Sequence, residues 1–272
     1  MLVPIRTPGE TFFLGLSSNV RFAVALLAGA LIGAGLGALI ESALIRPLYA
    51  RPIYQVLLTL GLSFVGTELV KSVWGPAGFY MDIPAFFNTS NKACPSDTLW
   101  LWFSQHCQSI MVLGRPFPSY RLFIIVLGLV MFLAITLLLQ RTRLGIIIRA
   151  GVQDSEMVQA LGINVRQIFT LVFAIGTALA AIGGVAAAPF IGVNLGLGLE
   201  VQLQGFISVV IGGMGSFAGA AVGALLVGLA RAFGDQLVLS VHLSPSIARA
   251  STVLIMALVL LLRPAGLFGK KD

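Results

Sequence analysis

The sequence predicts an all-α polytopic membrane protein. Of its 272 residues, 58% are hydrophobic and 10% are charged, whereas soluble domains carry roughly 25% charged residues. The mean hydropathy is +1.00, and apolar runs long enough to cross a bilayer core of about 30 Å as helices recur along the chain. So little charge cannot cover a soluble core with a polar surface, which excludes a soluble enzyme. We therefore expect one membrane-embedded body of about six or seven transmembrane or half-length helices.

Four apolar runs indicate the first transmembrane helices. Residues 1–21 precede them and lack the basic, apolar and small-residue progression of a cleavable signal. In the first run, Gly29, Gly33 and Gly37 recur at every fourth residue and lie along one stripe of a helix. Small residues let transmembrane backbones approach closely, so the stripe predicts a helix contact rather than a substrate groove. The four runs are Phe22–Ile40, Ile53–Val73, Leu122–Leu139 and Ile168–Pro189.

Residues 74–120, between the second and third helices, are rich in Pro, Ser, Asn and Trp and predict an external loop. A short interfacial helix is expected around Leu99–Phe103, because Trp100 and Trp102 favour headgroup depth. Cys94 and Cys107 both lie in this loop. An exported loop permits a disulfide between them, but their spacing leaves a disulfide and two separate thiols equally open.

The region after the fourth helix predicts an interrupted helix. Residues 205–233 are too many for one comfortable span and rather few for two, and their middle reads Gly212-Gly213-Met214-Gly215-Ser216. Glycine is a poor helix former, so we expect two half-length helices joined by a glycine break, with its backbone groups satisfied by protein or by a watery cavity. The last span, Ala250–Leu262, is short unless Pro245–Arg249 begins its helix.

Charge predicts the orientation, because Lys and Arg accumulate in cytoplasmic loops. The first two basic segments lie on the same side by helix parity, and we assign that side to the cytoplasm. The basic C-terminal tail lies on the same side if residues 205–233 cross the membrane an even number of times or turn back. The net charge of +7 comes from only 17 Lys and Arg, too few for a nucleic-acid surface. The three basic segments are Arg46 and Arg51; Arg141, Arg143, Arg149 and Arg166; and Arg263, Lys270 and Lys271.

No catalytic or metal-binding constellation is visible in the sequence. A phosphate-binding loop would end in Gly-Lys-Ser/Thr, but Gly269-Lys270 is followed by Lys271. His106 and His242 lie far apart, and neither has a helically spaced carboxylate or histidine partner. We therefore expect a transport subunit that is not an enzyme and has no metal or cofactor of its own.

Acidic residues fall at expected helix ends or in loops, where they give a coupling ion no obvious site. Carriers driven by protons or sodium usually place such groups within the membrane. Arg231 and Asp235 are four residues apart and are expected to pair at the end of a helix. Energy for transport is therefore expected from a partner. The acids concerned are Glu41, Glu68, Glu200 and Asp235.

Residues 141–167 predict a cytoplasmic loop that contains a short helix. Asp154 and Glu156 stand near the start of this helix, where carboxylates interact favourably with the helix dipole, and Gly162 stops it. A short amphipathic helix of this kind suits docking into a groove on a soluble partner. On physical grounds alone, docking and a solvated connector remain equally open.

The same loop resembles the cytoplasmic coupling loop of ABC importer permeases of the branched-chain amino acid family. The matching positions are Gly145, Arg149, Ala150, Asp154, Glu156, Leu161, Gly162, Ile163 and Asn164. Three further stretches are similar to that family: Glu41 through Arg46-Pro47-Leu48 with Thr59-Leu60-Gly61-Leu62; Gly212-Gly213-Met214-Gly215-Ser216 with Gly219-Ala220 and Gly223; and Arg263-Pro264-Ala265-Gly266-Leu267-Phe268-Gly269. The similarity covers residues 22–269, the expected permease domain. Residues 1–21 do not match the additional helices that usually begin these permeases, so we expect one or two helices to be lacking.

The resemblance implies a permease subunit of an ATP-binding-cassette importer, carrying branched-chain or similar amino acids across the bacterial inner membrane. It implies as partners a second related permease, two cytoplasmic ATP-binding subunits that hydrolyse ATP, and a periplasmic solute-binding protein. The helix around Arg149–Gly162 is expected to receive the ATPase motion, with Arg149 anchoring the loop and Gly162 ending the helix. The alternative is a self-sufficient carrier or channel for small polar solutes such as urea or short amides. A packed hinge that lines or flanks the translocation path is expected at Gly212, Gly213, Gly215, Ser216 and Gly219.

Overall fold

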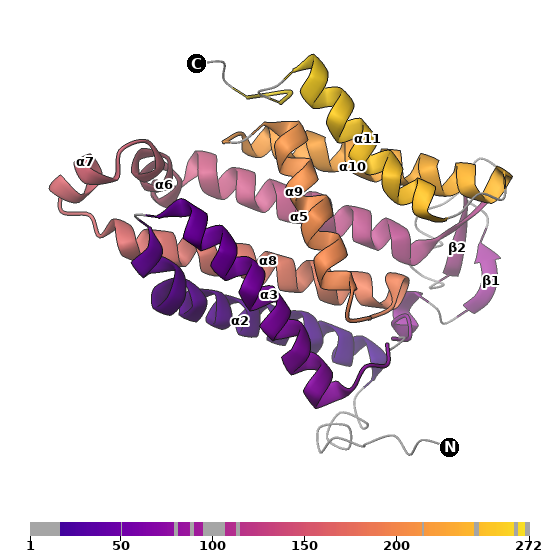
Figure 1. Cartoon of the computed structure of the whole chain (residues 1–272). Helices are drawn as coiled ribbons and strands as arrows, with labels where there is room; N and C mark the ends of the chain where they lie inside the picture. The colour runs from indigo at the N-terminus through magenta and orange to yellow at the C-terminus, as the bar shows by residue number, and fades with distance from the viewer. Residues whose placement is uncertain are drawn as a thin grey trace. The chain divides into compact units, whose positions relative to one another are not determined.

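The computed structural model divides the chain into two compact units, Met1–Val193 and Asn194–Asp272, which are described one at a time (Figure 1). Nearly all of the described secondary structure is helical, which confirms the predicted all-α class. The described residues are 17–49, 51–78, 81–87, 90–94, 107–112, 115–213, 215–241, 245–263 and 266–269.

The four long helices of the first unit confirm the four predicted spans. Each begins and ends within a few residues of its predicted bounds. Pro52 begins the second of them, at a position where proline's missing N–H costs no hydrogen bond. The four helices are α2 (Ser18–Ile40), α3 (Pro52–Trp74), α5 (Ser119–Arg141) and α8 (Val165–Ile191).

The helical chain does not stop after α2. It continues as a π-helical turn, η1 (Glu41–Ile45), and a 3₁₀ turn, η2 (Arg46–Leu48), so that Ser18–Leu48 forms one apolar stretch of 31 residues. Glu41 is the C-terminal cap of α2, as expected of a residue at a helix end, but the helical chain continues beyond it. Turns of π-helix occur mostly inside longer helices and frequently at functional sites.

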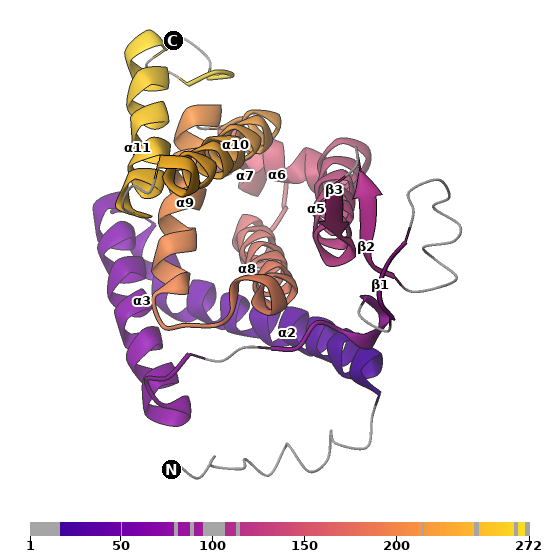
Figure 2. The same cartoon turned by 90° about the vertical axis from the view of Figure 1, so that its right-hand side faces the viewer.

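Helices α2 and α8 run side by side through the glycine stripe (Figure 1), and Figure 2 shows the same pairing from another direction. A Cβ atom added to Gly33 would lie 2.8 Å from the Ala181 Cβ and 2.9 Å from the Thr177 carbonyl oxygen. A Cβ added to Gly37 would overlap the Thr177 side chain. The predicted helix contact is therefore confirmed.

The loop at residues 74–120, predicted to be external, contains a small sheet that its sequence did not predict. Strand β1 (Ser90–Cys94) pairs in parallel with β2 (Cys107–Val112), and β2 pairs antiparallel with β3 (Arg115–Pro118). A short 3₁₀ turn, η3 (Ala85–Phe87), precedes the sheet. The helix expected at 99–103 lies outside the described residues, as do the side chains of the two cysteines, so a disulfide and two separate thiols remain the two alternatives for them.

An aromatic cluster joins the loop at residues 74–120 to the long helices of the first unit. Tyr120, at the start of α5, is 2% exposed, and its hydroxyl donates a 2.7 Å hydrogen bond to the Ala186 carbonyl of α8. Its ring packs against Phe22, Phe87 and Phe123, with centroids 5.4–6.3 Å away. Aromatic contacts at these distances are favourable, so this cluster fixes the ends of α2, α5 and α8 that lie next to this loop.

The second unit contains α9 (Leu197–Gly212), α10 (Phe217–Val241) and α11 (Pro245–Leu262). The predicted break at Gly212–Ser216 is confirmed, and α9 is short, with 16 residues, but α10 has 25 residues and is not half-length. Both helices extend beyond the predicted residues 205–233, because α9 begins at Leu197 and α10 continues to Val241. Pro245 begins α11, so the longer of the two alternatives for the last span is correct. The core of this unit is Ile207, Ile211 and Val227, packed by Leu226, Ile255, Met256, Val259 and Leu267.

By length and hydropathy, five helical stretches of the described chain can cross a membrane. Two shorter apolar helices, Leu197–Gly212 and Thr252–Leu262, accompany them. This agrees with the expected six or seven transmembrane or half-length helices, and the protein is a multi-pass membrane protein. The five stretches are Ser18–Leu48, Ile53–Trp74, Ser119–Arg141, Val165–Ile191 and Phe217–Val238.

Candidate functional site

The loop between α5 and α8 contains two short helices, α6 (Arg143–Gln153) and α7 (Ser155–Ala160). The predicted helix around Arg149–Gly162 is therefore divided into two helices, while the predicted helix start at Asp154 and Glu156 is confirmed for α7. Asp154 separates the two, because its backbone is extended and its carboxylate accepts hydrogen bonds from the amides of Glu156 (3.1 Å) and Met157 (2.9 Å). A carboxylate in this position caps the free amides of a helix start, so Asp154 ends one helix and begins the next.

Gly162 ends α7, as predicted. Its φ angle is +79°, and its amide donates to the Gln159 carbonyl at 2.9 Å, while the Ile163 amide reaches the Val158 carbonyl at 3.4 Å. This pair of bonds is the Schellman motif, in which a glycine takes the left-handed conformation after the last helical turn. Asn164 then caps α8 by accepting from the Gln167 amide at 3.3 Å. Leu161 to Asn164, four consecutive residues of the predicted coupling loop, thus form the whole connection between α7 and α8.

Arg149 and Gly145 hold α6 against the end of α5. The Arg149 Nη1 donates a 2.5 Å hydrogen bond to the Leu139 carbonyl, one of the carbonyls that a helix end leaves unpaired. Gly145 is buried against the same turn, where an added Cβ would overlap the Leu139 carbonyl oxygen and lie 2.7 Å from that of Leu138. Thr142 caps α6 by accepting from the Gly145 amide at 3.2 Å. The anchoring contact predicted for Arg149 is present.

Three apolar side chains of this loop are more than 60% exposed. Val152 and Leu161 are each 73% exposed and Met157 is 62% exposed, whereas Val158 on α7 is buried. We call Val152, Met157 and Leu161 the loop face. Ala150 and Ile163 are partly buried and belong to the loop's inner side.

The predicted glycine hinge is a tightly packed turn between α9 and α10. Gly212 and Gly219 approach so closely that a Cβ on either would overlap the backbone of the other. Gly213 and Gly215 have φ angles of +99° and +89°, and the Ser216 hydroxyl caps α10 by accepting from the Gly219 amide at 3.0 Å. The packing is as expected, while a position lining the translocation path stays a prediction.

The C-terminal residues 266–269 cover this glycine turn, a contact that the sequence analysis missed. The Leu267 amide donates to the Ile211 carbonyl at 2.9 Å, and the Phe268 amide donates to the Gly212 carbonyl at 3.0 Å. Gly266, with φ of +81°, lies where an added Cβ would be 2.5 Å from the Gly213 Cα. The motif near the C-terminus therefore satisfies the carbonyls that end α9.

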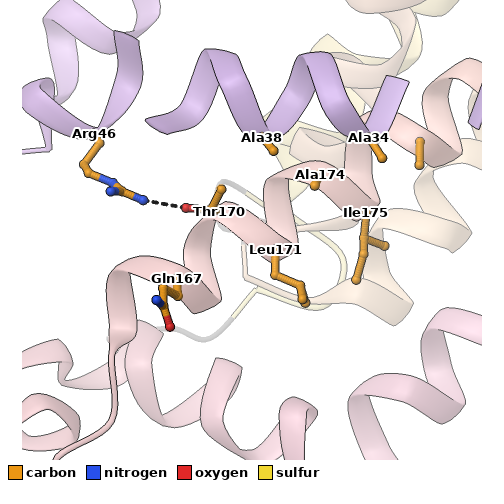
Figure 3. A pocket seen from close by; sticks show the side chains of 9 residues that line it. Ala34, Ala38, Arg46, Gln167, Thr170, Leu171, Ala174 and Ile175 are labelled. Atoms are coloured by element: carbon orange, nitrogen blue, oxygen red, sulfur yellow. Dashed lines mark hydrogen bonds between the residues drawn. The ribbon is translucent and has the colours of Figure 1, made fainter. Parts of the chain in front are cut away.

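A buried polar network joins the end of α2 to α8. Glu41 is 1% exposed, and its carboxylate accepts hydrogen bonds from the hydroxyls of Tyr49, at 2.5 Å, and Thr170. The Arg46 Nη2 donates to the Thr170 Oγ1 at 2.7 Å and lies 3.5 Å from the Glu41 Oε2 (Figure 3). Burying a carboxylate is costly unless it is paired and hydrogen-bonded. Arg46 pairs with the Glu41 carboxylate, and Tyr49 and Thr170 donate hydrogen bonds to it. This network could not be predicted from the sequence, because Thr170 lies 129 residues from Glu41.

A cavity of about 510 Å³ opens beside this network, between α2 and α8. Figure 3 shows Arg46 and Thr170 at one end and the small side chains of both helices along the remainder. Its lining is Ala34, Ala38, Arg46, Gln167, Thr170, Leu171, Ala174, Ile175 and Ala178.

In the second unit, Arg231 joins α10 to α9. Its Nη2 lies 2.7 Å from the Glu200 Oε1, whereas its Nε lies 4.0 Å from the Asp235 Oδ2. The predicted pair with Asp235 is thus present but is the longer of the two. Because α10 continues to Val241, the expectation that Arg231 ends its helix is wrong. A charge within an apolar span is costly unless it is paired, which accounts for the contact with Glu200.

The contribution of the Tyr49 hydroxyl to stability should depend on pH, because this hydroxyl belongs to the polar network around Glu41. Burial and then the hydrogen bond to Glu41 raise the pKa of Tyr49 above its ordinary value of 10.0. The neutral phenol is favoured in the folded chain, so its contribution to stability is full below pH 10.0 and is lost as the pH rises through the raised pKa. We expect Tyr49→Phe to lower Tm at neutral pH, and this loss to shrink in strongly alkaline buffer. Thermal unfolding across pH measures both effects.

Tyr54→Phe is the matched control, because Tyr54 is 53% exposed and its ring, which lies under Arg51, is retained. Equal Tm values for the two variants at neutral pH would contradict the role given to the Tyr49 hydroxyl.

Residues 8–262 match the family described as the permease component of branched-chain amino acid transport systems. A high-affinity branched-chain amino acid transport system permease protein of Pseudomonas aeruginosa, BraD, is 40% identical over 152 residues, which are 56% of this chain and 48% of that protein. The corresponding protein LivH of Escherichia coli K12 is 36% identical over 141 residues, 52% of this chain and 44% of LivH.

A more distant match is the fructose import permease protein FruF of Bifidobacterium longum, 27% identical over 230 residues, or 82% of this chain and 57% of FruF. The chain thus spans about half the length of the curated relatives it matches. No solved structure matches it.

Proposed function

Because the chain belongs to the family of permease components of branched-chain amino acid transport systems, we propose that it is the membrane permease subunit of an ATP-binding-cassette importer. The proposed cargo is a branched-chain or similar amino acid, and the proposed location is the bacterial inner membrane. Energy comes from ATP hydrolysed by partner subunits, and the chain itself holds no cofactor. The observation that carries this proposal is the anchored loop α6–α7, on a chain with five helices able to span a membrane.

The loop face is proposed to meet the ATP-binding subunit. Val152, Met157 and Leu161 are 62–73% exposed on a loop that the charge distribution assigns to the cytoplasm. Apolar anchors on short helices fit a groove on a soluble partner, and no residue of the described chain covers them. The earlier alternative of a solvated connector does not account for three outward apolar side chains.

A displacement of α7 would be transmitted to the transmembrane helices through two rigid connections. The turn from Gly162 to Asn164 joins α7 directly to α8. Arg149 ties α6 to the last turn of α5. From α8, the glycine stripe transmits displacement to α2, because their backbones are in direct contact at Gly33. Such packed elements move as units rather than deforming continuously.

The proposed assembly contains a second related permease, two ATP-binding subunits and an external solute-binding protein. Family membership supports this arrangement, and the sequence has no phosphate-binding loop that could supply energy within the chain.

Reconstitution tests the proposal. The chain is co-expressed with the candidate ATP-binding subunits and second permease, purified, and placed in liposomes with the solute-binding protein. We expect the subunits to co-purify and labelled leucine to accumulate only with ATP. Uptake of leucine, urea or a short amide by the purified chain alone would overturn the proposal in favour of a self-sufficient carrier. ATP-dependent uptake of fructose without leucine would retain the importer and reject the cargo.

A further inference from the structure

The cavity between α2 and α8 has the properties of a small-molecule site. Its volume of about 510 Å³ falls within the roughly 300–1,000 Å³ typical of ligand pockets. Arg46, Gln167 and Thr170 stand at one end, and alanine, leucine and isoleucine side chains line the rest (Figure 3). A cavity divided in this way favours a ligand with one charged end and a short apolar chain.

The Arg46 guanidinium has donors that the protein leaves unused. Its Nη2 is committed to Thr170 and Glu41, but its Nε is buried without a hydrogen-bond partner. Within the described ranges, Nη1 makes no hydrogen bond either. The side chain is 34% exposed, so its Nη1 group remains within reach of a molecule in the cavity, whereas the buried Nε does not. Nη1 can donate charge-assisted hydrogen bonds to a carboxylate.

The cavity offers no comparable site for an ammonium group. Glu41 is the nearest carboxylate in the network, but it is 1% exposed and already accepts from Tyr49 and Thr170. The Gln167 amide is neutral and can only supplement a charged partner. Charge complementarity in this cavity therefore selects a negative end and not a positive one.

We propose that this cavity binds a small aliphatic carboxylate, with the carboxylate on Arg46 and the aliphatic chain against Ala174, Ile175 and Ala178. Branched-chain amino acids belong to this class of ligand. The site lies at the ends of α2 and α8 that the charge distribution assigns to the cytoplasm, so its occupant is a molecule on the exit side. This proposal rests on the proposed function, which supplies the amino acid.

Binding is measured on the purified importer complex in lipid nanodiscs, without the solute-binding protein, so that only membrane sites are observed. The probes are leucine, isocaproate, which lacks the ammonium group, and isoamylamine, which lacks the carboxylate. We expect leucine and isocaproate to bind with similar affinity and isoamylamine to bind about tenfold more weakly or not at all, because the charge-assisted hydrogen bonds are lost. Isoamylamine binding as tightly as leucine would overturn the proposal.

Two variants test whether the ligand binds in the cavity between α2 and α8. Arg46→Gln removes the charge, and Ala178→Leu fills the apolar end. Each is expected to weaken leucine and isocaproate by about tenfold or more. Ala180→Leu is the matched control, because it makes the same change on an exposed position of α8 outside the cavity lining. If Arg46→Gln fails to fold, the double variant E41Q/R46Q, which removes both charges of the pair, takes its place.

Unchanged affinity in the Arg46 and Ala178 variants would overturn the assignment of the site. Leucine uptake by the wild-type complex is measured in parallel. Wild-type uptake without binding at the cavity defeats this proposal and leaves the importer intact, whereas absence of wild-type uptake defeats the proposed function.

Discussion

Replacing Gly37 by leucine should force α2 away from α8 and destabilise the first unit more than any other single change considered. An added Cβ at this position would overlap the Thr177 Oγ1 and lie 2.8 Å from the Thr177 Cβ, so rotating one hydroxyl does not make room. Overpacking of this kind costs about 1–3 kcal/mol. Because the same contact adjoins the Glu41 network, we expect a lower yield of folded protein, a lower Tm and loss of uptake together.

Gly35→Leu provides the control for this experiment. Gly35 lies two positions away on the same helix, and nothing lies within 4 Å of the Cβ that would be added there. The two variants share the same change in helix propensity and hydropathy and differ only in the neighbour they meet. Fluorescence-detected size exclusion and thermal unfolding compare them. Equal stability of Gly35→Leu and Gly37→Leu would show that the α2–α8 contact is not as close as the structure has it.

The second large effect is expected from Gly162→Val, which should reduce uptake by about tenfold or more while the complex still assembles. Gly162 has φ of +79°, a conformation that a β-branched residue adopts only under strain. Space is not the obstacle, since nothing lies within 4 Å of an added Cβ. The strained turn would loosen the connection from α7 to α8. ATP hydrolysis should therefore continue without a matching rate of amino-acid transport.

Gly162→Asn separates backbone strain from the mere presence of a side chain. Asparagine tolerates the left-handed conformation better than other non-glycine residues, so this variant should retain most uptake. The ratio of leucine transported to ATP hydrolysed is measured for both variants in liposomes. An equal ratio in wild type and Gly162→Val would refute the coupling role, and an equally low ratio in both variants would refute the explanation by backbone conformation.

Hydropathy was sufficient to predict most of the helices. A transmembrane helix satisfies its own backbone, so an apolar run of the right length determines both its location and its type. Glycine spacing similarly predicted the contact of α2 with α8, because a repeat of four residues places small side chains on one face.

Features that depend on one particular side chain or on distant partners were harder to predict. The helix start at Asp154 and Glu156 was predicted, but the separate helix α6 before it was not. The burial of Glu41 was not predicted, because its partner Thr170 is far away in the sequence. The pairing of Arg231 with Glu200 likewise required α9 and α10 to be placed side by side. The strands of the external loop follow no clear alternation of apolar and polar residues.

The contact of residues 266–269 with the glycine turn also determines when, during biosynthesis, the carbonyls of this turn become hydrogen-bonded. The carbonyls of Ile211 and Gly212 are made and inserted well before Leu267 and Phe268, which donate to them. Until α11 has been synthesised, the α9–α10 hairpin carries two unpaired acceptors, which are unfavourable in a membrane. The α9–α10 hairpin therefore completes its hydrogen bonding only after residues 267 and 268, beyond α11, have been synthesised.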